Sequence, residues 1–501
     1  MKILFVHKGR EHLGIESLSS VLKQAGHAVE LALDPGLFSR EDNALCSPLL
    51  ETWFSRTDAI MDRMEKFRPA VIAFSVYSTT YQWALTMARR AKERFKLPVL
   101  FGGIHPTLVP EEVMSHACVD FLIRGEAEAA VVEFAAAFEA GQPLDDIRNL
   151  WFRKNDAIVK NEVRPAVRDL DGIPFPDKEL FAGDVRYRDD YMIMATRGCV
   201  YNCSYCCEGY LNYLYSNKHF RQRGVDSVMQ ELLAAKKKYN YKEVMFFDSI
   251  FFVDREWVKE LLGRFAREIG VPFRCTGHVN FMDEELVALM KEAGCYCIDF
   301  GVQTFNQDIR KNFLNRPEDN SQIQRVFTLC DNARLRYDVD LLLGLPQATE
   351  TDYAMVLEML EGHAYLNRVK CYFLSYYPQL AMVAKAREFG ALAQSDVDDI
   401  TRGQINDWFH ADGARHAGQK RLIRNFAVLY KIYPLLPGAL RRSIMRRKWY
   451  RHWYLLPWGI VVLAQLIIGA QHRDYRFWIY IRNYAFQVKK QIKILWRRGA
   501  A

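Results

Sequence analysis

The chain has 501 residues, of which 50% are hydrophobic and 26% charged, and its formal net charge is +8. This length exceeds what one compact core holds, so two or three domains are expected, and the composition excludes a disordered chain. Eleven cysteines, and a beginning that is typical of a buried strand and not of a signal peptide, predict a reducing cytoplasm.

Residues 1–150 alternate short apolar runs with helical stretches. This alternation predicts an α/β domain with a doubly wound parallel sheet, whose ligands bind beyond the carboxyl ends of the strands. The expected strands are 2–6, 28–33, 70–75, 98–101 and 119–122, and the expected helices are 16–24, 83–94, 110–115 and 126–140.

The loops after the third, fourth and fifth of these strands span residues 75–80, 102–107 and 124–126. Their small hydroxyl residues and paired glycines let the backbone approach a large flat ligand. No Gly-x-Gly-x-x-Gly follows the first strand, which argues against a dinucleotide.

Residues 151–190 form a bridge to the next domain. A hairpin is expected over 152–163, around Asn155 and Asp156, and residues 170–176 are a linker stiffened by prolines. Such a linker can hold one domain over the mouth of the next.

Cys199, Cys203 and Cys206 stand at positions n, n+4 and n+7 of a loop that follows an apolar run. Three soft ligands in one loop can hold a single small metal assembly, whereas a structural zinc or an ordinary [4Fe-4S] centre needs four. Cys207 is adjacent to Cys206, so its side chain would point elsewhere. The spacing predicts a [4Fe-4S] cluster with one open iron; a structural metal or free thiols are the alternative.

Residues 191–385 alternate again, and six βα units fit a partial (β/α)6 barrel with the cysteine loop at the carboxyl end of its first strand, where barrel active sites lie. The expected strands are 192–195, 243–247, 273–277, 297–302, 337–343 and 370–374.

The Cys-x-x-x-Cys-x-aromatic-Cys loop resembles that of the radical S-adenosylmethionine (SAM) superfamily. The resemblance implies that the cluster on Cys199, Cys203 and Cys206 binds SAM at its open iron. One electron, from a flavodoxin- or ferredoxin-type donor, would cleave SAM to methionine and a 5'-deoxyadenosyl radical. The cofactor contacts that it implies are Tyr205 near the adenine, Asp248 near the methionine moiety, Gln303 near the ribose, and Leu345 and Pro346 beside the adenine.

Two of these positions depart from the family pattern. Ser249 replaces the second of two adjacent acids, and Gln303 replaces a glutamate, so it can hydrogen-bond a hydroxyl but carries no charge.

With this motif downstream, the first domain resembles the cobalamin-binding domain that precedes many radical SAM domains. The Asp-x-His-x-x-Gly signature is absent, because His7 is followed three residues on by Arg10 and His12 by Ile15. We therefore expect no histidine on the lower face of cobalt. A degenerate domain kept for packing is the alternative. The expected cobalamin contacts are Ser75, Ser78, Thr79, Gly102, Gly103, His105 and Glu126.

The end of the chain is basic. Residues 439–501 carry 14 Lys and Arg and one acid, a net charge of +13, which leaves −5 for the rest. The 18 uncharged residues of 453–470 approach the ~20 that span a bilayer. Pro457, Gly459 and Gln465 weaken such a span, so attachment to an anionic membrane surface is favoured. A cap over the barrel and a true span are the alternatives, and the long apolar run argues against nucleic acid.

The sequence therefore predicts a cobalamin-dependent radical SAM enzyme that methylates an unactivated carbon of a lipid-like substrate, peripheral to the inner face of the cytoplasmic membrane. The resemblance to hopanoid methylases covers residues 1–385. A cyclase of the anaerobic magnesium-protoporphyrin ester type and a corrinoid- or cluster-based sensor are the alternatives, and no catalytic residue beyond the cluster ligands is expected. The predicted parts are a cobalamin-binding domain (1–150), a hairpin and linker (151–190), a barrel (191–385), a helical extension (386–440) and a basic apolar tail (441–501).

Overall fold

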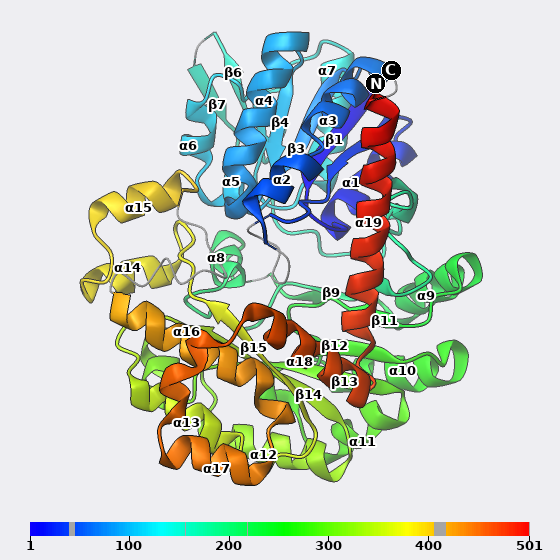
Figure 1. Ribbon diagram of the computed structural model, residues 1–501. Helices are drawn as coiled ribbons and strands as arrows, with labels where there is room; N and C mark the ends of the chain where they lie inside the picture. The colour runs from blue at the N-terminus through cyan, green and yellow to red at the C-terminus, as the bar shows by residue number, and fades with distance from the viewer. Residues whose placement is uncertain (40–45, 156, 218, 405–416, 500–501) are drawn as a thin grey trace.

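A computed structural model describes residues 1–39, 46–155, 157–217, 219–404 and 417–499. Two sheets lie one above the other, the first formed by the beginning of the chain and the second by its middle (Figure 1). Helices at the end of the chain cover one side of both (Figure 1).

The first sheet has the order β2-β1-β3-β4-β5-β6-β7, and its first five strands are parallel, as predicted. The antiparallel pair β6 and β7 extends this sheet past residue 150; in its turn Asn155 has a φ of 48°, and Asp156 lies outside the described residues. The strands are β1 (Lys2–Lys8), β2 (Ala28–Asp34), β3 (Val71–Ser75), β4 (Val99–Gly102), β5 (Phe121–Ile123), β6 (Leu150–Lys154) and β7 (Ala157–Lys160).

Both faces of the first sheet are covered, which explains its continuous apolar strands. In β1, Ile3 and Phe5 pack with α1 and α7, whereas Leu4 and Val6 pack with α3 and α4. The helices are α1 (Leu13–Gln24), α2 (Pro48–Phe54), α3 (Thr57–Phe67), α4 (Tyr81–Phe95), α5 (Ile104–Leu108), α6 (Pro110–Ser115) and α7 (Glu128–Glu139).

The second sheet has six parallel strands in the order β15-β14-β13-β12-β11-β8, which confirms the predicted partial barrel. Its strands are β8 (Tyr191–Ile193), β11 (Val244–Phe246), β12 (Phe273–Gly277), β13 (Cys295–Gln303), β14 (Arg336–Leu343) and β15 (Leu366–Phe373). Its helices are α9 (Val225–Tyr239), α10 (Arg255–Arg264), α11 (Glu284–Glu292), α12 (Asn320–Asn332) and α13 (Glu350–Met359). Smaller elements near its carboxyl edge are β9 (Thr196–Arg197), α8 (Cys207–Leu214), β10 (Arg221–Gln222), α14 (Ala381–Glu388) and α15 (Gln394–Thr401).

The tail packs on the body of the molecule. Helix α16 (Ala417–Ile432) contacts β15, α18 (Trp458–Gln471) contacts α16, and α19 (Tyr475–Gly499) runs from the barrel back to the first domain (Figure 1). A short helix, α17 (Gly438–Arg446), precedes α18. None of the helices in the described ranges combines the length and apolar character that a membrane span requires.

Polar contacts fix α19 to both domains. Arg56 of the first domain donates to the amide oxygens of Gln487 and Gln491, at 2.7 and 3.0 Å. Lys490 pairs with Asp184 at 2.6 Å. Part of the basic charge of the tail is therefore matched by acids of the body, which the sequence did not indicate.

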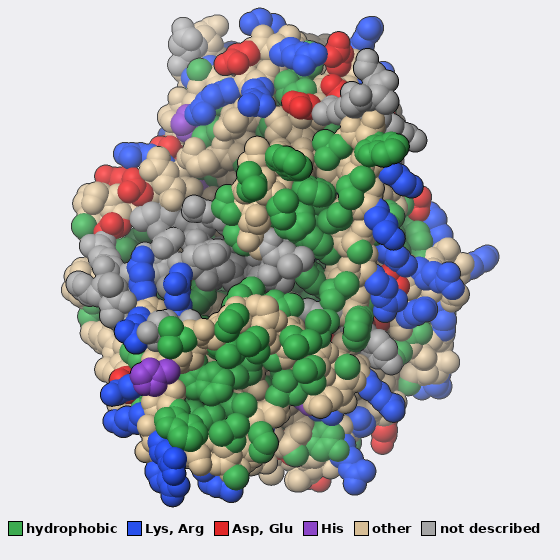
Figure 2. All heavy atoms as spheres, in the orientation of Figure 1, with side chains coloured by type: hydrophobic (Ala, Val, Ile, Leu, Met, Phe, Trp, Pro, Cys, Tyr) green, Lys and Arg blue, Asp and Glu red, His purple; other side chains and the backbone are tan. Residues whose placement is uncertain are grey.

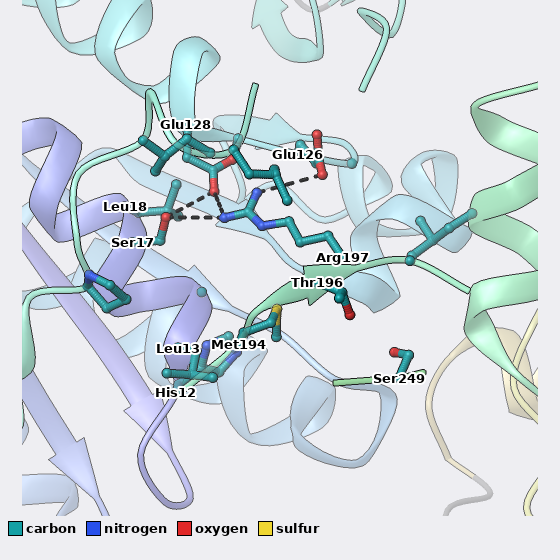
Figure 3. Close-up of a pocket in the computed structure, with 18 of the residues that line it drawn as sticks. His12, Leu13, Ser17, Leu18, Glu126, Glu128, Met194, Thr196, Arg197 and Ser249 are labelled. Carbon is teal, nitrogen blue, oxygen red and sulfur yellow. Dashed lines mark hydrogen bonds and ion pairs between the residues drawn. The ribbon is translucent and has the colours of Figure 1, made fainter. Parts of the chain in front are cut away.

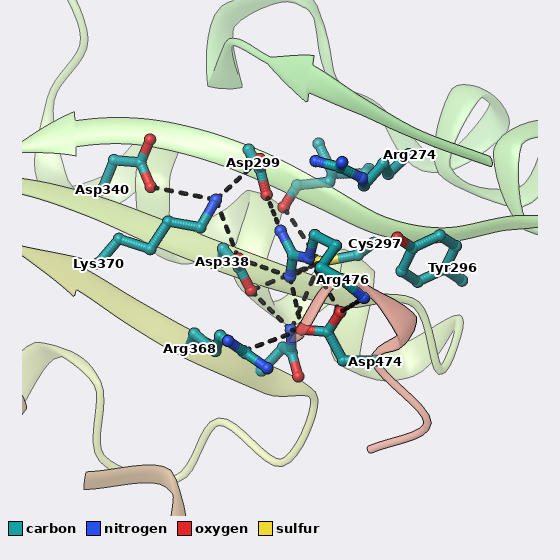
Figure 4. A network of polar contacts seen from close by, with 12 residues as sticks. Arg274, Tyr296, Cys297, Asp299, Asp338, Asp340, Arg368, Lys370, Asp474 and Arg476 are labelled. Atoms are coloured by element: carbon teal, nitrogen blue, oxygen red, sulfur yellow. Dashed lines mark hydrogen bonds and ion pairs between the residues drawn. The ribbon is translucent and has the colours of Figure 1, made fainter. Parts of the chain in front are cut away.

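A buried ion network joins the start of α19 to the barrel (Figure 4). The Arg476 guanidinium lies 3.0 Å from Asp299, 2.7 Å from Asp338 and 2.9 Å from Asp474. Lys370 lies 2.8 Å from Asp299 and 3.1 Å from Asp338. Cations of the protein therefore already neutralise these carboxylates, which argues against a metal ion there, although Cys297 lies close to them.

Asp340 also belongs to this network, but its carboxylate lies farther from the Lys370 ammonium, at 3.8 Å. Burial raises the pKa of this carboxyl to about 7. Because this pKa is raised on folding, the group contributes stability below about pH 4 and loses it as the pH rises through 7. We expect Asp340→Asn to raise the free energy of unfolding by about 1–3 kcal/mol at pH 8 and to have a clearly smaller effect at pH 5. Urea unfolding at both pH values measures this, and an equal effect at both would contradict it.

Candidate active site

A cavity of about 380 Å³ lies between the carboxyl ends of the strands of the two sheets. Arg197 of the barrel reaches across it to Glu128 at 2.7 Å and Ser17 at 3.5 Å, both on the first domain, as Figure 3 shows. Glu126 accepts two hydrogen bonds from Arg221, each of 2.8–2.9 Å. These ion pairs hold the ligand-binding edges of the two domains face to face. Residues that line the cavity include His12, Ser17, Ser75, Gly103, Glu126, Glu128, Phe175, Thr196, Arg197, Gly198, Glu208, His219 and Ser249.

The cysteine loop lies between β9 and α8. Burial raises the pKa of all three thiols, to about 11 for Cys199. A neighbouring thiol of the triad, Cys203, raises the pKa of Cys199 and Cys206 further. Three crowded thiols with raised pKa become thiolates when a cation binds them. The loop therefore fits an iron–sulfur cluster. Cys207 packs against the core of the first domain.

Arg316 lies beside this triad. Its guanidinium is 3.9 Å from the Cys203 sulfur and donates to the Tyr205 hydroxyl at 3.0 Å. Tyr205 and Leu345 contribute to one apolar cluster, so the structure brings together two residues predicted near the adenine. Pro346, half-buried, follows Leu345.

Gln303 lies at an irregularity between β13 and β14, where its φ is +67°. A Cβ on Gly301 would lie 2.7 Å from its amide nitrogen, so the Gln303 side chain folds back over its own strand. This conformation presents a neutral amide at the carboxyl edge of the barrel.

Asp248 follows β11 and binds the residues that lead into the cysteine loop. One carboxylate oxygen accepts from the Ala195 amide at 3.0 Å and from the Thr196 hydroxyl at 2.7 Å. The other oxygen is buried and has no hydrogen-bond partner among the described residues. Burial raises the pKa of this carboxyl to about 7. The orphaned oxygen fits a donor group on a bound cofactor.

Glu208 supplies an acid beside Ser249, where the sequence lacks one. Its carboxylate accepts from the Ser249 hydroxyl at 2.5 Å and lies 3.0 Å from the His219 ring. All three residues line the cavity. The sequence analysis missed this contact because the acid lies on α8, 41 residues from the serine; its place directly after the cysteine loop was the available signal.

In the first domain, Ser75 and Gly103 line the cavity, whereas Ser78 and His105 are fully buried and pair with each other at 2.8 Å. The His105 ring packs on Tyr81, with ring centroids 4.2 Å apart. Gly102 ends β4, and Thr79 lies in a short 3₁₀ turn after β3. Among the predicted contacts, the structure therefore places Ser75, Gly103 and Glu126 at the cavity.

Both ring nitrogens of His12 are engaged. Nδ1 accepts from the Ile15 amide at 3.1 Å, which leaves the proton on Nε2, 3.1 Å from the hydroxyls of Ser75 and Tyr77. Burial lowers the pKa of His12 to about 4, so the ring is neutral at pH 7.

Gly198 precedes the first cysteine with a φ of +85°, and an added Cβ would lie 2.3 Å from the His219 carbonyl oxygen. We expect Gly198→Ala to displace the loop, at a cost of about 1–3 kcal/mol, and to reduce iron incorporation severalfold. Iron and sulfide analysis with circular dichroism measures both effects. Gly459→Ala is the control, because its Cβ meets nothing within 4 Å; iron contents equal to that control would contradict the prediction.

Two family models match the chain: B12 binding domain over residues 9–135 and Radical SAM superfamily over 193–360. An uncharacterised methyltransferase of Pyrococcus horikoshii is 29% identical over 48% of this chain and 53% of its own length. The hopanoid C-3 methylase of Methylococcus capsulatus is 23% identical over 61% of this chain and 56% of its own length. The chain thus spans little more than half of each of these relatives.

Two solved structures share the fold. TsrM from Kitasatospora setae, a radical SAM methyltransferase with cobalamin and a [4Fe-4S] cluster bound, has a TM-score of 0.65 and 15% identity, over 94% of this chain and 99% of its own. OxsB, a cobalamin-dependent SAM radical enzyme with aqua-cobalamin and SAM bound, has a TM-score of 0.64 and 13% identity, over 100% of this chain and 81% of its own.

Proposed function

From the premise that the chain is a radical SAM superfamily protein with an N-terminal B12-binding domain, we propose that it is a cobalamin-dependent radical SAM C-methyltransferase. The single observation that carries the proposal is the cavity shared by the two ligand-binding edges. Gly198 and Glu208, which flank the three-cysteine loop, line it on one side, and Ser75 and Gly103 line it on the other.

In this proposal Cys199, Cys203 and Cys206 hold a [4Fe-4S] cluster, Asp248 and Glu208 face SAM, and Ser75 and Gly103 face cobalamin. When bound, the cluster and SAM supply a 5'-deoxyadenosyl radical, and cobalamin supplies a methyl group. The protein contributes alignment. The Arg197 and Arg221 ion pairs keep the two edges in register, and no side-chain acid or base is required.

Water exclusion is the second contribution of the protein. Leu170, Ile173 and Phe175 of the linker line the cavity together with Leu13 and Leu18 of α1. These apolar side chains favour a hydrophobic, lipid-like substrate over a charged one, and they protect a reactive species from solvent.

We further propose a flavodoxin- or ferredoxin-type electron donor and a cytoplasmic location, peripheral to the inner face of the membrane. The basic, apolar tail supports the second of these.

The test is anaerobic reconstitution with iron, sulfide and cobalamin, followed by SAM, a reductant and a lipid extract from the source organism. Near-equal amounts of 5'-deoxyadenosine and S-adenosylhomocysteine, both dependent on cobalamin and extract, are expected. Formation of 5'-deoxyadenosine without S-adenosylhomocysteine would contradict methylation. It would favour cyclisation or oxidation, the alternative of the magnesium-protoporphyrin cyclase type. If cluster-loaded protein forms neither product with any lipid fraction, the enzyme proposal is overturned in favour of a sensor.

A further inference from the structure

Helix α2 of the first domain presents two large apolar side chains to the outside. None of its seven residues is buried. The Leu49 side chain is 73% exposed and that of Trp53 is 68% exposed. Leaving such side chains in water forgoes hydrophobic stabilisation, so an exposed pair on one short helix indicates an interaction surface.

The outer side of α18 is also apolar. Ile460, Leu463 and Ile467 recur at helical spacing and are all exposed, whereas Val461 and Ile468 on the inner side are buried. The helix therefore packs with one apolar side and presents a second apolar side to the outside.

The outer side of α19 mixes large apolar residues with cations. Trp478, Lys489, Ile492 and Lys493 fall on one side of this helix and are exposed. The opposite side carries Gln487, which contacts Arg56 of the first domain and Asp184 of the linker. Tryptophan interleaved with lysine is typical of helices that lie at a membrane surface.

These three surfaces are continuous. Phe38 packs between α2 and α19, with its ring centroid 5.0 Å from that of Phe54 and 5.4 Å from that of Tyr484. Helix α18 contacts α19. Hydrophobic side chains gather on this one face, over both the first domain and the barrel, with Lys and Arg along its edge (Figure 2).

We propose that α2, α18 and α19 together form a docking face for an anionic lipid bilayer. This inference deepens the peripheral attachment proposed above, because it makes the first domain, and not the tail alone, part of the membrane contact. It does not depend on the reaction.

The charge of the tail, which supplies α18 and α19, favours lipid over a protein partner, and the one acid of α2, Glu51, pairs with Lys8 at 3.2 Å. The sole acid of residues 439–501, Asp474, is buried in the ion network. Arg446, Arg447 and Lys448 precede α18 and are exposed. Protein interfaces are depleted in lysine, whereas each Lys or Arg near an anionic bilayer strengthens binding to it.

Docking by this face would also orient the molecule. The contact would include both domains, so the bilayer would run alongside the junction that holds the cavity.

Sedimentation with lipid vesicles tests the proposal. The full-length protein should bind vesicles of phosphatidylcholine with added phosphatidylglycerol and should bind pure phosphatidylcholine vesicles weakly. The double variant Leu49→Ser, Trp53→Ser should bind about tenfold more weakly or worse, at unchanged thermal stability. Leu233→Ser on α9, an exposed leucine outside the docking face, is the matched control.

Lack of binding to anionic vesicles, or binding unchanged in the double variant, would overturn the proposal. A concentration-dependent dimer in analytical ultracentrifugation that the double variant abolishes would assign the face to a second copy of the chain and would also overturn it. Methylation of a detergent-dispersed substrate reports the proposed function separately, and the double variant should leave that activity unchanged.

Discussion

Replacement of Cys199, Cys203 or Cys206 by alanine will remove the iron–sulfur cluster and reduce SAM cleavage to background. Three thiolates are the smallest set that can hold a cluster with an open iron, so two remaining ligands cannot retain it. Burial raises the pKa of these thiols. Because the thiols are buried, water can take the place of a removed cysteine only if the loop is distorted. Iron content, the visible absorption of the reconstituted protein and 5'-deoxyadenosine formation measure the effect.

Cys207→Ala is the matched control for this series. Its side chain packs against the core of the first domain. The variant should keep full iron content and SAM cleavage. A loss equal to that of the three other variants would show that Cys207 is a ligand and would contradict the assignment of the triad.

Replacement of Arg476 by methionine will destabilise the protein by about 3–5 kcal/mol, because it removes one partner from a buried ion network. Asp338 and Asp474 have almost no exposed surface, and Arg476 lies within 3.0 Å of both. Burial favours the neutral carboxyl of Asp299, but Lys370 and Arg476 hold its pKa well below the usual range. Arg476 and Arg368 do the same for the buried carboxyl of Asp474. Urea unfolding at neutral pH measures the loss.

The same pKa shifts set the pH dependence of this loss. A carboxyl whose pKa is depressed on folding contributes stability above its unfolded pKa and loses it as the pH falls. The cost of Arg476→Met should therefore be full at pH 7 and shrink in acid. Arg473→Ala, an exposed position three residues earlier, should lie within about 0.5 kcal/mol of the wild type. Equal effects of the two substitutions would show that the network does not stabilise the tail.

The periodicity of the sequence predicted the layers of both domains. The strands of the first domain were expected within a few residues of where they lie, and the six parallel barrel strands follow one another in space as in sequence. This succeeded because strand and helix periods are local properties, and because short right-handed connections place consecutive parallel strands side by side. The three-cysteine spacing could be recognised for the same reason, because Cys199, Cys203 and Cys206 lie close together in one loop.

Other parts of the site depended on the path of the chain. Glu208 reaches Ser249 and Arg221 reaches Glu126 across sequence separations that no spacing pattern encodes. His105 was expected at the cofactor because it follows a Gly-Gly pair, yet the fold buries it against Tyr81. Side-chain direction in a loop after a strand is decided by packing, and the sequence carries no periodic signal for it.

The tail shows the same division. Its composition alone determined that it is basic and apolar. Only the tertiary structure decided that Arg476 enters the barrel network, that α19 returns to the first domain, and that α2 joins it in one exposed face. The physical reason is that composition sets the free energy available from burial and charge pairing. Which side chains the tail residues pair with depends on long-range contacts, which exist only once the chain has folded.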